Sequence, residues 1–390
     1  MKPSRRLKVA LLSYRDDPRT GGALRVAEML ATHLPKEEIE AHLVFAYGQA
    51  GPVANRVPVP VHFLEASSSK DFAAWRKTRK WFSQMQFDVM HFIDPVNWVF
   101  FATLGLKAKR IDHFHGCPDL STIASRDQCL ALCRRWLSHG GIAITHGARK
   151  AVGRIGWRSP AQTHVVHNGI CPEDFETMPD KLTARQQLNL PLDAKLFGAV
   201  ARFSDGSGLL EIFQVLKFLP ENWHAVLVGD GPLKHQLQSE ARQLGFADRV
   251  HFPGLLTNVL PAYAALDAVI LLARYQSFCL MLAEAMLARI PVVGLQGAGE
   301  YTEAEYPLIT NENAIFFPRE KPWDFYSVEP DENYHKVALA LQTMMLNPES
   351  TQHRVAQAHR WVIERFSAQH QGRRCAQVYR HVSGLKQLCE

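Results

Sequence analysis

The sequence has no long run of apolar residues and no dense set of cysteines. None of its apolar runs approaches the 18 or so residues that a helix needs to span a bilayer. Its seven cysteines lack both the Cys-x-x-Cys spacing of a zinc or redox site and the even count of a disulfide framework. Cys129 and Cys133 lie one helical turn apart, with no His-rich segment beside them. These absences favour a cytoplasmic protein with reduced thiols.

Acidic residues are scarce in the first half of the chain. Residues 1–190 contain 26 Lys and Arg against 17 Asp and Glu, whereas residues 191–390 contain 18 against 21. A basic half suits an anionic acceptor, an acidic membrane surface or nucleic acid. No nucleic-acid recognition motif is present, and the basic residues form no stripe with aromatic platforms. We therefore expect no nucleic-acid partner, and peripheral contact with the inner face of a membrane stays open.

The first 14 residues are basic and then apolar, which is also the order of a signal peptide. The apolar part is short, and Arg15 follows it together with two aspartates. This pattern favours a first β-strand over a signal peptide.

Length and the order of predicted elements indicate two α/β domains. A chain of 390 residues with 47% hydrophobic and 21% charged residues suits two domains of similar size. Strand-like and helix-like segments alternate in both halves, which predicts parallel sheets covered on both faces. The strand-like segments are Lys8–Tyr14, His42–Tyr47, Val59–Leu64, Asp88–Ile93, Ile111–Phe114, Gly141–Thr145, His164–Val166, Leu196–Ala201, His224–Val228, Val250–Phe252, Ala268–Leu272 and Pro291–Gly294.

We expect the helices and the domain boundary at the following places. Helical patterns cover Ala23–Leu34, Ala124–Leu137 and Pro232–Leu244, and the stretch Glu349–Leu388 looks helical throughout. The polar, proline-containing stretch Cys171–Lys195 is expected to hold the linker. The expected Rossmann-like domains are therefore residues 1–180 and 181–367, followed by a last helix over 368–390.

The segment Ala273–Met286 points to an anion site. It follows the apolar run Ala268–Leu272 and is followed by Pro291-Val-Val, so it forms a strand–loop–helix–strand unit. In parallel α/β sheets the free N–H groups and positive dipole at such a helix N-terminus bind anionic ligands.

This segment resembles the signature of the retaining GT-B glycosyltransferases of glycosyltransferase family 4. That signature has two glutamates separated by seven residues, with Phe-Gly-Leu between them. The second glutamate is Glu284 here, whereas the first position holds Gln276 and the usual glycine is Cys279. Further landmarks follow in the family's order: Thr20-Gly-Gly-Ala, His113-Phe-His-Gly, His167-Asn-Gly with Phe175, Ala201-Arg-Phe, Gly229-Asp-Gly-Pro, Val250-His-Phe-Pro-Gly, Pro291-Val-Val and Glu364-Arg-Phe-Ser.

The resemblance implies a GT-B fold, in which two Rossmann-like domains face one another and the last helix packs back on the first domain. It also implies transfer of a sugar from a nucleotide-diphosphate sugar to an acceptor hydroxyl on a glycan, a lipid-linked sugar or a small molecule. No metal and no cofactor would be needed. Retention would follow a front-face route without a protein nucleophile.

The resemblance also assigns the donor side. Glu284 would accept hydrogen bonds from ribose hydroxyls, and the backbone N–H groups around Phe278, Cys279 and Leu280 would meet the phosphates. Arg202 would clamp the diphosphate, because a guanidinium can bind two phosphate oxygens at once. The plain structural alternatives are a capping or ion-paired Glu284, a packed Cys279 and a surface ion pair for Arg202.

Two positions depart from the family pattern. Gln276 stands where the family's glutamate touches sugar hydroxyls; an amide still accepts and donates there, but the negative charge is lost. Ser207 stands where the family has a lysine, so it offers a hydrogen bond without charge. Gln276 either tunes donor choice, which we favour, or weakens catalysis. The alternative function is therefore a catalytically impaired nucleotide-sugar-binding or scaffold subunit.

In the first domain, Gly21 and Gly22 would let the backbone approach a phosphate or the acceptor closely, or would simply form a tight turn. His115 best matches the family's histidine near the transferred sugar, and we count it with Gln276 and Arg202 as catalytic. His113, two residues away, and Asp94, at the end of another strand, are acceptor-side candidates.

One segment of the first domain, Asp71–Gln86, is both basic and aromatic. We favour an ordinary amphipathic helix with its aromatic side chains in the core, and the alternative is a helix that lies on an anionic bilayer. The residues concerned are Trp75, Arg76, Lys77, Arg79, Lys80, Trp81 and Phe82.

Overall fold

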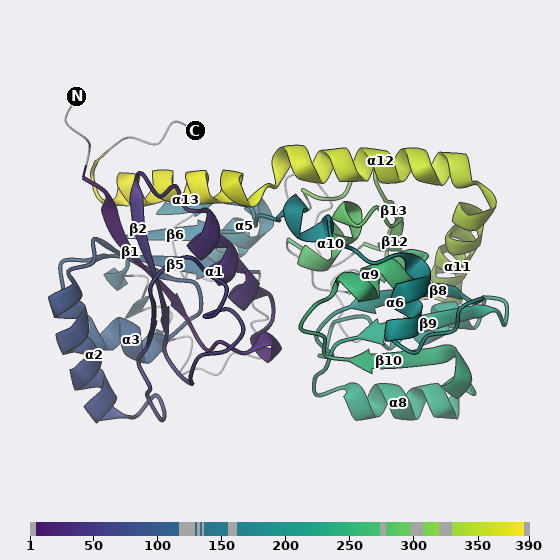
Figure 1. The fold of residues 1–390 in the computed structure, drawn as a ribbon, viewed down its shortest axis with the longest axis horizontal. Coiled ribbons are helices and arrows are strands. Elements are labelled where there is room, and N and C mark those ends of the chain that lie inside the picture. The colour runs from purple at the N-terminus through teal and green to yellow at the C-terminus, as the bar shows by residue number, and fades with distance from the viewer. Residues whose placement is uncertain are drawn as a thin grey trace. The chain divides into compact units, whose positions relative to one another are not determined.

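The computed structural model describes residues 5–116, 129–130, 133–134, 136–154, 162–273, 278–296, 307–319 and 330–385. The chain divides into two compact units, Met1–Gly169 with Phe366–Glu390 and Ile170–Arg365 (Figure 1). Each unit contains one sheet in which all described strand pairs are parallel, which confirms the predicted α/β class.

The first unit is built on a seven-stranded sheet of order β3-β2-β1-β4-β5-β6-β7. Its strands are β1 (Leu7–Ser13), β2 (Ile39–Phe45), β3 (Val61–Phe63), β4 (Val89–Phe92), β5 (Lys109–Phe114), β6 (Gly140–Ala143) and β7 (Thr163–Val165). Side chains alternate between the two faces of a strand. On β1, Leu7, Val9 and Leu11 accordingly enter one core, whereas Ala10 and Leu12 enter the other.

Helices cover both faces of this sheet. The described helices are α1 (Gly22–His33), α2 (Phe72–Met85), α3 (Asn97–Ala102), α5 (His146–Arg154) and α13 (Ala368–Val382). Side chains of α1 and α13 share one core with the strands, and those of α2 and α3 share the other. Figure 1 shows α13, in yellow, against the first sheet, although it comes from the far end of the sequence.

The second unit repeats the design with a six-stranded sheet of order β10-β9-β8-β11-β12-β13. Its strands are β8 (Lys195–Val200), β9 (Trp223–Val228), β10 (Val250–Gly254), β11 (Ala268–Leu271), β12 (Val292–Leu295) and β13 (Ile315–Phe317). The helices described around it are α6 (Lys181–Gln187), α7 (Glu211–Leu216), α8 (Lys234–Gln243), α9 (Leu260–Ala265), α10 (Leu280–Leu287), α11 (Asp331–Leu346) and α12 (Pro348–Arg365).

Three segments differ from the sequence-based expectation. The C-terminal stretch is not one helix, because it breaks between Arg365 and Ala368, where the Ser367 side chain caps α13 by accepting from the His370 amide at 3.2 Å. The short strand β13 was not predicted. The polar stretch 171–195 contains a 3-10 turn and α6, so it has secondary structure of its own. The helix expected over 124–137 falls largely outside the described residues.

In the part of the chain that the structure describes, no helix is both long enough and apolar enough to cross a bilayer.

Candidate functional site

In each sheet the strand order reverses beside one strand. β1 lies between β2 and β4, and β8 lies between β9 and β11. Ligands of open parallel sheets bind at the carboxyl ends of the strands at such a switch point, because the connections on its two sides run to opposite faces. Most of the described site residues predicted from the sequence follow these strands or lie in the helices that come after them, whereas His113 and His115 lie at the end of β5, the next strand beyond β4.

In the second unit, Arg202 and Ser207 lie in the loop that follows β8. The Arg202 side chain is exposed and makes no ion pair or hydrogen bond with any described residue. The hydroxyl oxygen of Ser207 is buried and has no hydrogen-bond partner among the described atoms. Within the described part of the chain, this loop therefore presents a cation and a hydroxyl without partners at the same strand end.

Two glycines allow the neighbouring loops to lie in close contact at the carboxyl end of β8. Gly208 has a φ of 73°, and a Cβ there would lie 2.3 Å from the carbonyl oxygen of Leu272, directly after β11. A Cβ on Gly229 would lie 2.0 Å from the carbonyl oxygen of Ala201. No side chain fits at either position, so the loops after β8, β9 and β11 meet through bare backbone.

The N-terminus of α10 opens at the same edge. Cys279 is its N-cap residue, and among the described residues no side-chain capping hydrogen bond is made there. Burial raises the pKa of the Cys279 thiol to about 11, with a further contribution from the Glu284 charge. The thiol therefore stays protonated at neutral pH, which fits a packing role and not a thiolate nucleophile. Phe278 is buried, and Leu280 begins the helix.

Glu284 lies one turn into α10 and is half-buried. The fully buried Tyr263 of α9 donates a hydrogen bond from its hydroxyl to Oε2 of Glu284 at 2.7 Å. Burial, and then the charge of Glu284, raise the pKa of Tyr263 well above its ordinary value, so the hydroxyl remains a donor. Glu284 is thus a carboxylate held in place by a buried tyrosine, which the sequence did not predict.

Arg319, which the sequence also did not single out, holds the ends of two strands together. Its side chain is fully buried and donates to the carbonyl oxygens of Leu272 and Gln296, which follow β11 and β12. It also pairs with Glu211 of α7 at 2.9 Å. The sequence signal would have been a lone arginine two residues after the apolar segment Ile315–Phe317.

One donor-side position predicted from the sequence, Gln276, lies outside the described residues.

In the first unit, Asp94 follows β4 and ties it to the end of β1. Its Oδ2 accepts hydrogen bonds from the Ser13 hydroxyl at 2.6 Å and from the Tyr14 amide at 2.9 Å. Oδ2 of Asp94, an acceptor-side candidate, therefore holds the ends of β1 and β4 together at the switch point.

Gly21 and Gly22 begin α1 at this carboxyl edge. Gly21 is the N-cap residue with a φ of 85°, and no side chain caps the helix. A Cβ on Gly21 would meet no atom within 4 Å, so the glycine is required by its backbone conformation and not by crowding.

His115 follows β5, and its hydrogen bond fixes its tautomer. Nε2 lies 2.9 Å from the carbonyl oxygen of Ile93. A carbonyl can only accept, so Nε2 must carry the proton, and Nδ1 of the neutral ring is a hydrogen-bond acceptor. Burial lowers the pKa of His115, while the Ile93 bond and the charge of Asp94 oppose that shift. The ring can therefore accept a bond from a ligand hydroxyl.

His113 belongs to a buried polar chain that reaches α13. Its Nδ1 lies 3.0 Å from Nε2 of His91, whose Nδ1 lies 2.8 Å from the hydroxyl of Tyr379. The rings of His113 and His115 stack with their centroids 4.4 Å apart. Burial lowers the pKa of His91 to about 3 and that of His113 well below its ordinary value. Nε2 of His113 is buried without a partner among the described atoms.

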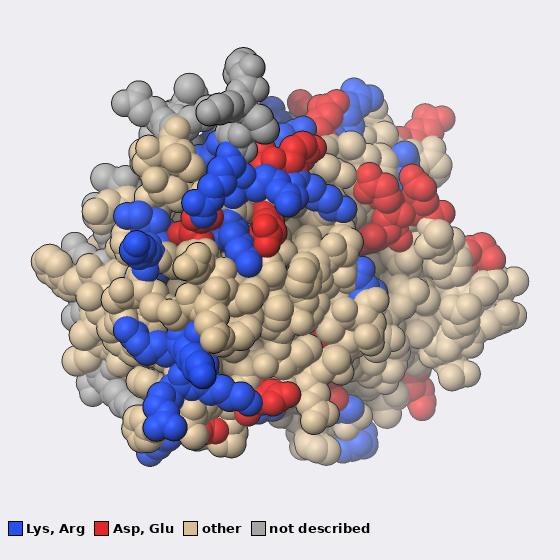
Figure 2. All heavy atoms as spheres, turned by 60° about the vertical axis from the view of Figure 1, so that its left-hand side comes forward, with Lys and Arg blue, Asp and Glu red and all other residues tan. Residues whose placement is uncertain are grey.

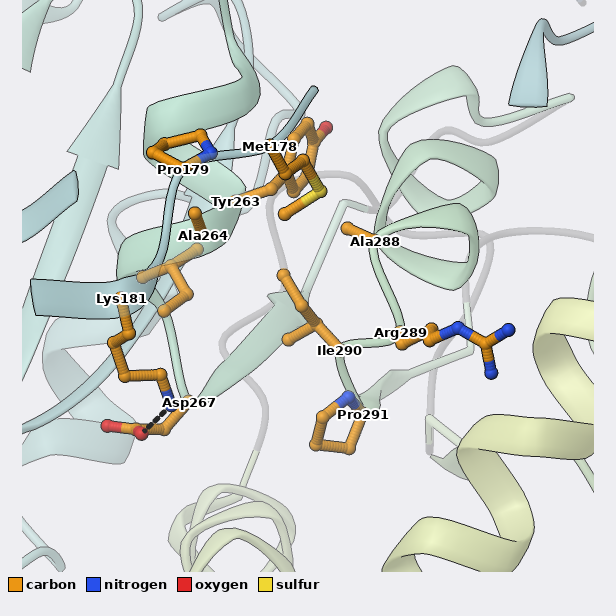
Figure 3. Close-up of a pocket in the computed structure, with 11 residues that line it drawn as sticks. Met178, Pro179, Lys181, Tyr263, Ala264, Asp267, Ala288, Arg289, Ile290 and Pro291 are labelled. Carbon is orange, nitrogen blue, oxygen red and sulfur yellow. Dashed lines mark hydrogen bonds and ion pairs between the residues drawn. The ribbon is translucent and has the colours of Figure 1, made fainter. Parts of the chain in front are cut away.

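A separate cavity of about 240 Å³ lies at the opposite edge of the second sheet (Figure 3). Asp267 and Pro291 line it, and they directly precede β11 and β12. Lys181 and Asp267 form an ion pair at 2.7 Å on its wall. Tyr263 also lines it, but none of the predicted donor-binding residues does. This cavity is therefore not the predicted donor site.

Among the described residues, no group of three or more His, Cys, Asp and Glu side chains is placed to hold a metal ion.

Comparison with known families accounts for both halves of the chain. The model described as Glycosyltransferase Family 4 matches residues 20–174, and the model described as Glycosyl transferases group 1 matches residues 180–325. The chain belongs to the group 1, family 4 glycosyltransferases. The two matches fall on either side of residues 175–179, close to the end of the first unit.

This glycosyltransferase resembles curated relatives over part of their length. It is 31% identical over 147 residues to the lipopolysaccharide core biosynthesis mannosyltransferase LpsB of Rhizobium meliloti, covering 36% of this chain and 42% of LpsB. It is 22% identical over 312 residues to the N-acetyl-alpha-D-glucosaminyl L-malate synthase of Bacillus anthracis, covering 75% of this chain and 80% of that protein. The match thus spans less than half of the mannosyltransferase.

Solved structures share the GT-B fold of this glycosyltransferase. HepE of Anabaena in complex with UDP-glucose superposes with a TM-score of 0.78 at 19% identity, over 97% of this chain and 100% of HepE. WaaG, a glycosyltransferase involved in lipopolysaccharide biosynthesis, superposes with a TM-score of 0.69 at 15% identity, over 95% and 99% of the two chains. At these identities the likeness establishes the fold.

Proposed function

We propose that this chain transfers a sugar from a nucleotide-diphosphate sugar to an acceptor hydroxyl, with retention of the anomeric configuration and without a metal ion. The observation that carries the proposal is the set of groups gathered at the carboxyl ends of β8 and β11. Arg202, which has no partner among the described residues, the N-terminus of α10 and the tyrosine-held carboxylate of Glu284 all belong to it.

The edge has the chemistry that a nucleotide-diphosphate requires. A diphosphate is an anion, and the N-terminus of α10 and the Arg202 guanidinium attract negative charge. Ribose hydroxyls are donors, and the Glu284 side-chain oxygens are acceptors that Tyr263 keeps in one orientation. The Ser207 hydroxyl adds a hydrogen bond without charge. These groups together would bind the diphosphate and the ribose.

In the proposed reaction the bond between the sugar and the diphosphate breaks as the acceptor oxygen approaches from the same face. The helix dipole and Arg202 stabilise the charge that develops on the leaving diphosphate, which is the task a metal ion performs elsewhere. The leaving phosphate takes the proton of the acceptor hydroxyl, so no protein nucleophile is needed. The acceptor nitrogen of His115 would position a sugar hydroxyl in the first unit, with Gly21, Gly22, Asp94 and His113 beside it.

The relatives suggest which substrates to test first. HepE has been crystallised with UDP and with UDP-glucose, and LpsB is a lipopolysaccharide core mannosyltransferase. We propose a nucleotide-diphosphate hexose, with UDP-glucose as the first candidate, and an acceptor that is a lipid-linked sugar or glycan. Such an acceptor would bring the chain to the inner face of a membrane as a peripheral protein.

The second candidate is a nucleotide-sugar-binding subunit with impaired catalysis. The observation that favours it is the loss of charge at two positions, since Ser207 and Gln276 replace a lysine and a glutamate of the family pattern. Isothermal titration with nucleotide sugars, combined with a product assay on lipid-linked acceptors, distinguishes the two. Binding followed by transfer supports the enzyme, whereas tight binding without transfer to any acceptor supports the subunit.

The donor site is tested by Glu284→Ala. Removing a charged acceptor of two ribose hydroxyls should weaken nucleotide binding by about a hundredfold, because a hydrogen bond to a charged group contributes about 1.5–3 kcal/mol. The matched control is Glu240→Ala on α8, which should bind as the unaltered chain does. Near-normal affinity in a folded Glu284→Ala variant would remove Glu284 from the donor site.

A further inference from the structure

Helix α2 presents an outward face of positive charge. Arg76, Lys77 and Lys80 are exposed on it, and the helix contains no acidic residue between Phe72 and Met85. Figure 2 shows a compact group of Lys and Arg side chains low on this face of the molecule, on the first unit. The transfer reaction proposed above makes no use of this surface.

The inner face of α2 is fully used by the core. Ala74, Thr78 and Phe82 are buried, and Trp75 and Trp81 pack against the same core. The aromatic side chains therefore lie where the sequence favoured them. Because this apolar face is occupied, α2 cannot turn over to bury it in lipid, and its cations stay directed outward.

The cations on the outward face have no partners among the residues that the structure describes. Arg76, Lys77 and Lys80 make no ion pair and no hydrogen bond with any described residue. Arg79 differs, because its guanidinium donates to the carbonyl oxygens of Ala102 and Leu104 and thereby ties α2 to the end of α3. The three side chains carry the same charge, so their combined field attracts an anionic surface.

An exposed aromatic residue adjoins the cations. Phe72, the first residue of α2, is 72% exposed. Its ring centroid lies 5.6 Å from that of Trp75. A large apolar side chain in water has an unfavourable free energy that burial in another phase would remove. Exposed cations beside an exposed aromatic residue are typical of surfaces that bind at a lipid headgroup layer.

We propose that the outward face of α2 docks on an anionic lipid bilayer. Arg76, Lys77 and Lys80 would lie against acidic headgroups, and Phe72 would enter the boundary between headgroups and acyl chains. Nucleic acid fits this face less well, because the cations lie on a convex helix with no groove for a backbone and no outward aromatic pair for base stacking. Docking needs neither donor nor acceptor, so its failure and the failure of the transfer reaction are distinguishable.

The test is co-sedimentation of the full chain with vesicles of phosphatidylcholine, with and without phosphatidylglycerol. We expect binding to the anionic vesicles only, and its loss at high salt, because exposed charges are screened within about 3 Å at 1 M ionic strength. Each cation near an anionic surface strengthens binding about fivefold. The triple variant Arg76→Gln, Lys77→Gln, Lys80→Gln should therefore bind about a hundredfold more weakly, and Phe72→Ser should bind several-fold more weakly.

The control carries the same change of charge elsewhere. Lys195→Gln, Arg242→Gln and Arg360→Gln neutralise three exposed cations of the second unit and should leave vesicle binding unchanged. Glutamine is a good helix former at the five helical positions, and Lys195 is an exposed residue at the start of β8, so both triple variants should keep the fold, as circular dichroism would verify. Equal binding by the two triple variants would overturn the proposal. So would binding to heparin or RNA without binding to vesicles.

Discussion

Glu284 depends for its orientation on Tyr263, a residue that is distant from it in the sequence. The two are 21 positions apart, yet the tyrosine hydroxyl lies 2.7 Å from the carboxylate. The apolar spacing of the segment predicts a helix for Glu284 but cannot show which side chain will face it. The sequence offered one hint, the tyrosine at position 263 in an apolar segment, because a buried hydroxyl needs a hydrogen-bond partner.

Tyr263→Phe should weaken nucleotide binding while leaving the fold intact. The phenylalanine keeps the ring in the core but removes the donor to Glu284, so the carboxylate loses its fixed orientation. We expect roughly tenfold weaker binding of UDP or UDP-glucose by isothermal titration, which corresponds to one hydrogen bond to a charged group. Tyr334→Phe, at a buried tyrosine of α11, is the control and should not change binding. Equal affinities of the two variants would show that Tyr263 does not orient the site.

At the scale of elements, α13 completes the first unit although it is the last helix of the chain. Tyr379, Cys375 and Val378 belong to the same core as α1 and the strands. Gly372 lets the two helices touch, because a Cβ there would lie 2.3 Å from the carbonyl oxygen of His33 at the end of α1.

Gly372→Ala should therefore destabilise the protein, against the usual effect in a helix. A glycine-to-alanine change inside a helix normally stabilises it by about 1 kcal/mol. Here the added methyl meets backbone and forces α13 away from α1, so we expect a loss of roughly 1–3 kcal/mol in the free energy of unfolding. Urea unfolding measures it, and Gln369→Ala on the exposed face of α13 should change it by less than about 0.5 kcal/mol. A stabilised Gly372→Ala variant would contradict the observed packing.

The order of helices and strands was predictable from the sequence, whereas the break between α12 and α13 and the edge strand β13 were not. The central strands are apolar runs between turn residues, and β1, β8, β9 and β11 begin and end within about a residue of their predicted limits. The separation of α12 from α13 depends on one serine cap, and helical periodicity continues across it. The short strand β13 is held in place by its pairing with β12, and this pairing joins segments that are distant in the sequence.

At the scale of the whole molecule, the topology explains why the candidate site was predictable in outline. Arg202, Glu284 and Asp94 are far apart in the sequence, but each belongs to a segment that follows a strand at or next to a switch point, and His115 follows β5, one strand further. A parallel sheet gathers such segments at its carboxyl edge. The sequence pattern could not identify the residues that support the site, such as Arg319. A buried side chain that donates hydrogen bonds to backbone carbonyls produces no hydrophobic periodicity in the sequence.

The buried histidines make stability depend on pH. The pKa of His91 is about 3 in the folded protein against 6.5 for a free histidine, because burial disfavours the charged ring. The unfolded chain therefore binds more protons below pH 6.5, so the stability contributed by neutral His91 is complete above that pH and is lost as the pH falls towards 3.

His91→Gln should flatten this dependence. Removing one such histidine lowers the slope of the free energy of unfolding by about 1.4 kcal/mol per pH unit between roughly pH 4 and 5.5. Urea unfolding of the unaltered chain and the variant across this range measures the difference. His353→Gln, at an exposed position of α12, is the control. Equal slopes for His91→Gln and the unaltered chain would show that His91 is not buried in its neutral form.

The first unit is discontinuous in sequence, since residues 170–365 separate its strands from α13. On a ribosome the strands emerge long before the helix that covers them, and synthesis of the intervening residues takes roughly 10–40 s at usual bacterial rates. During that interval the apolar surface meant for Cys375 and Tyr379 faces water or a chaperone. The half that is translated first is consequently the half that matures last.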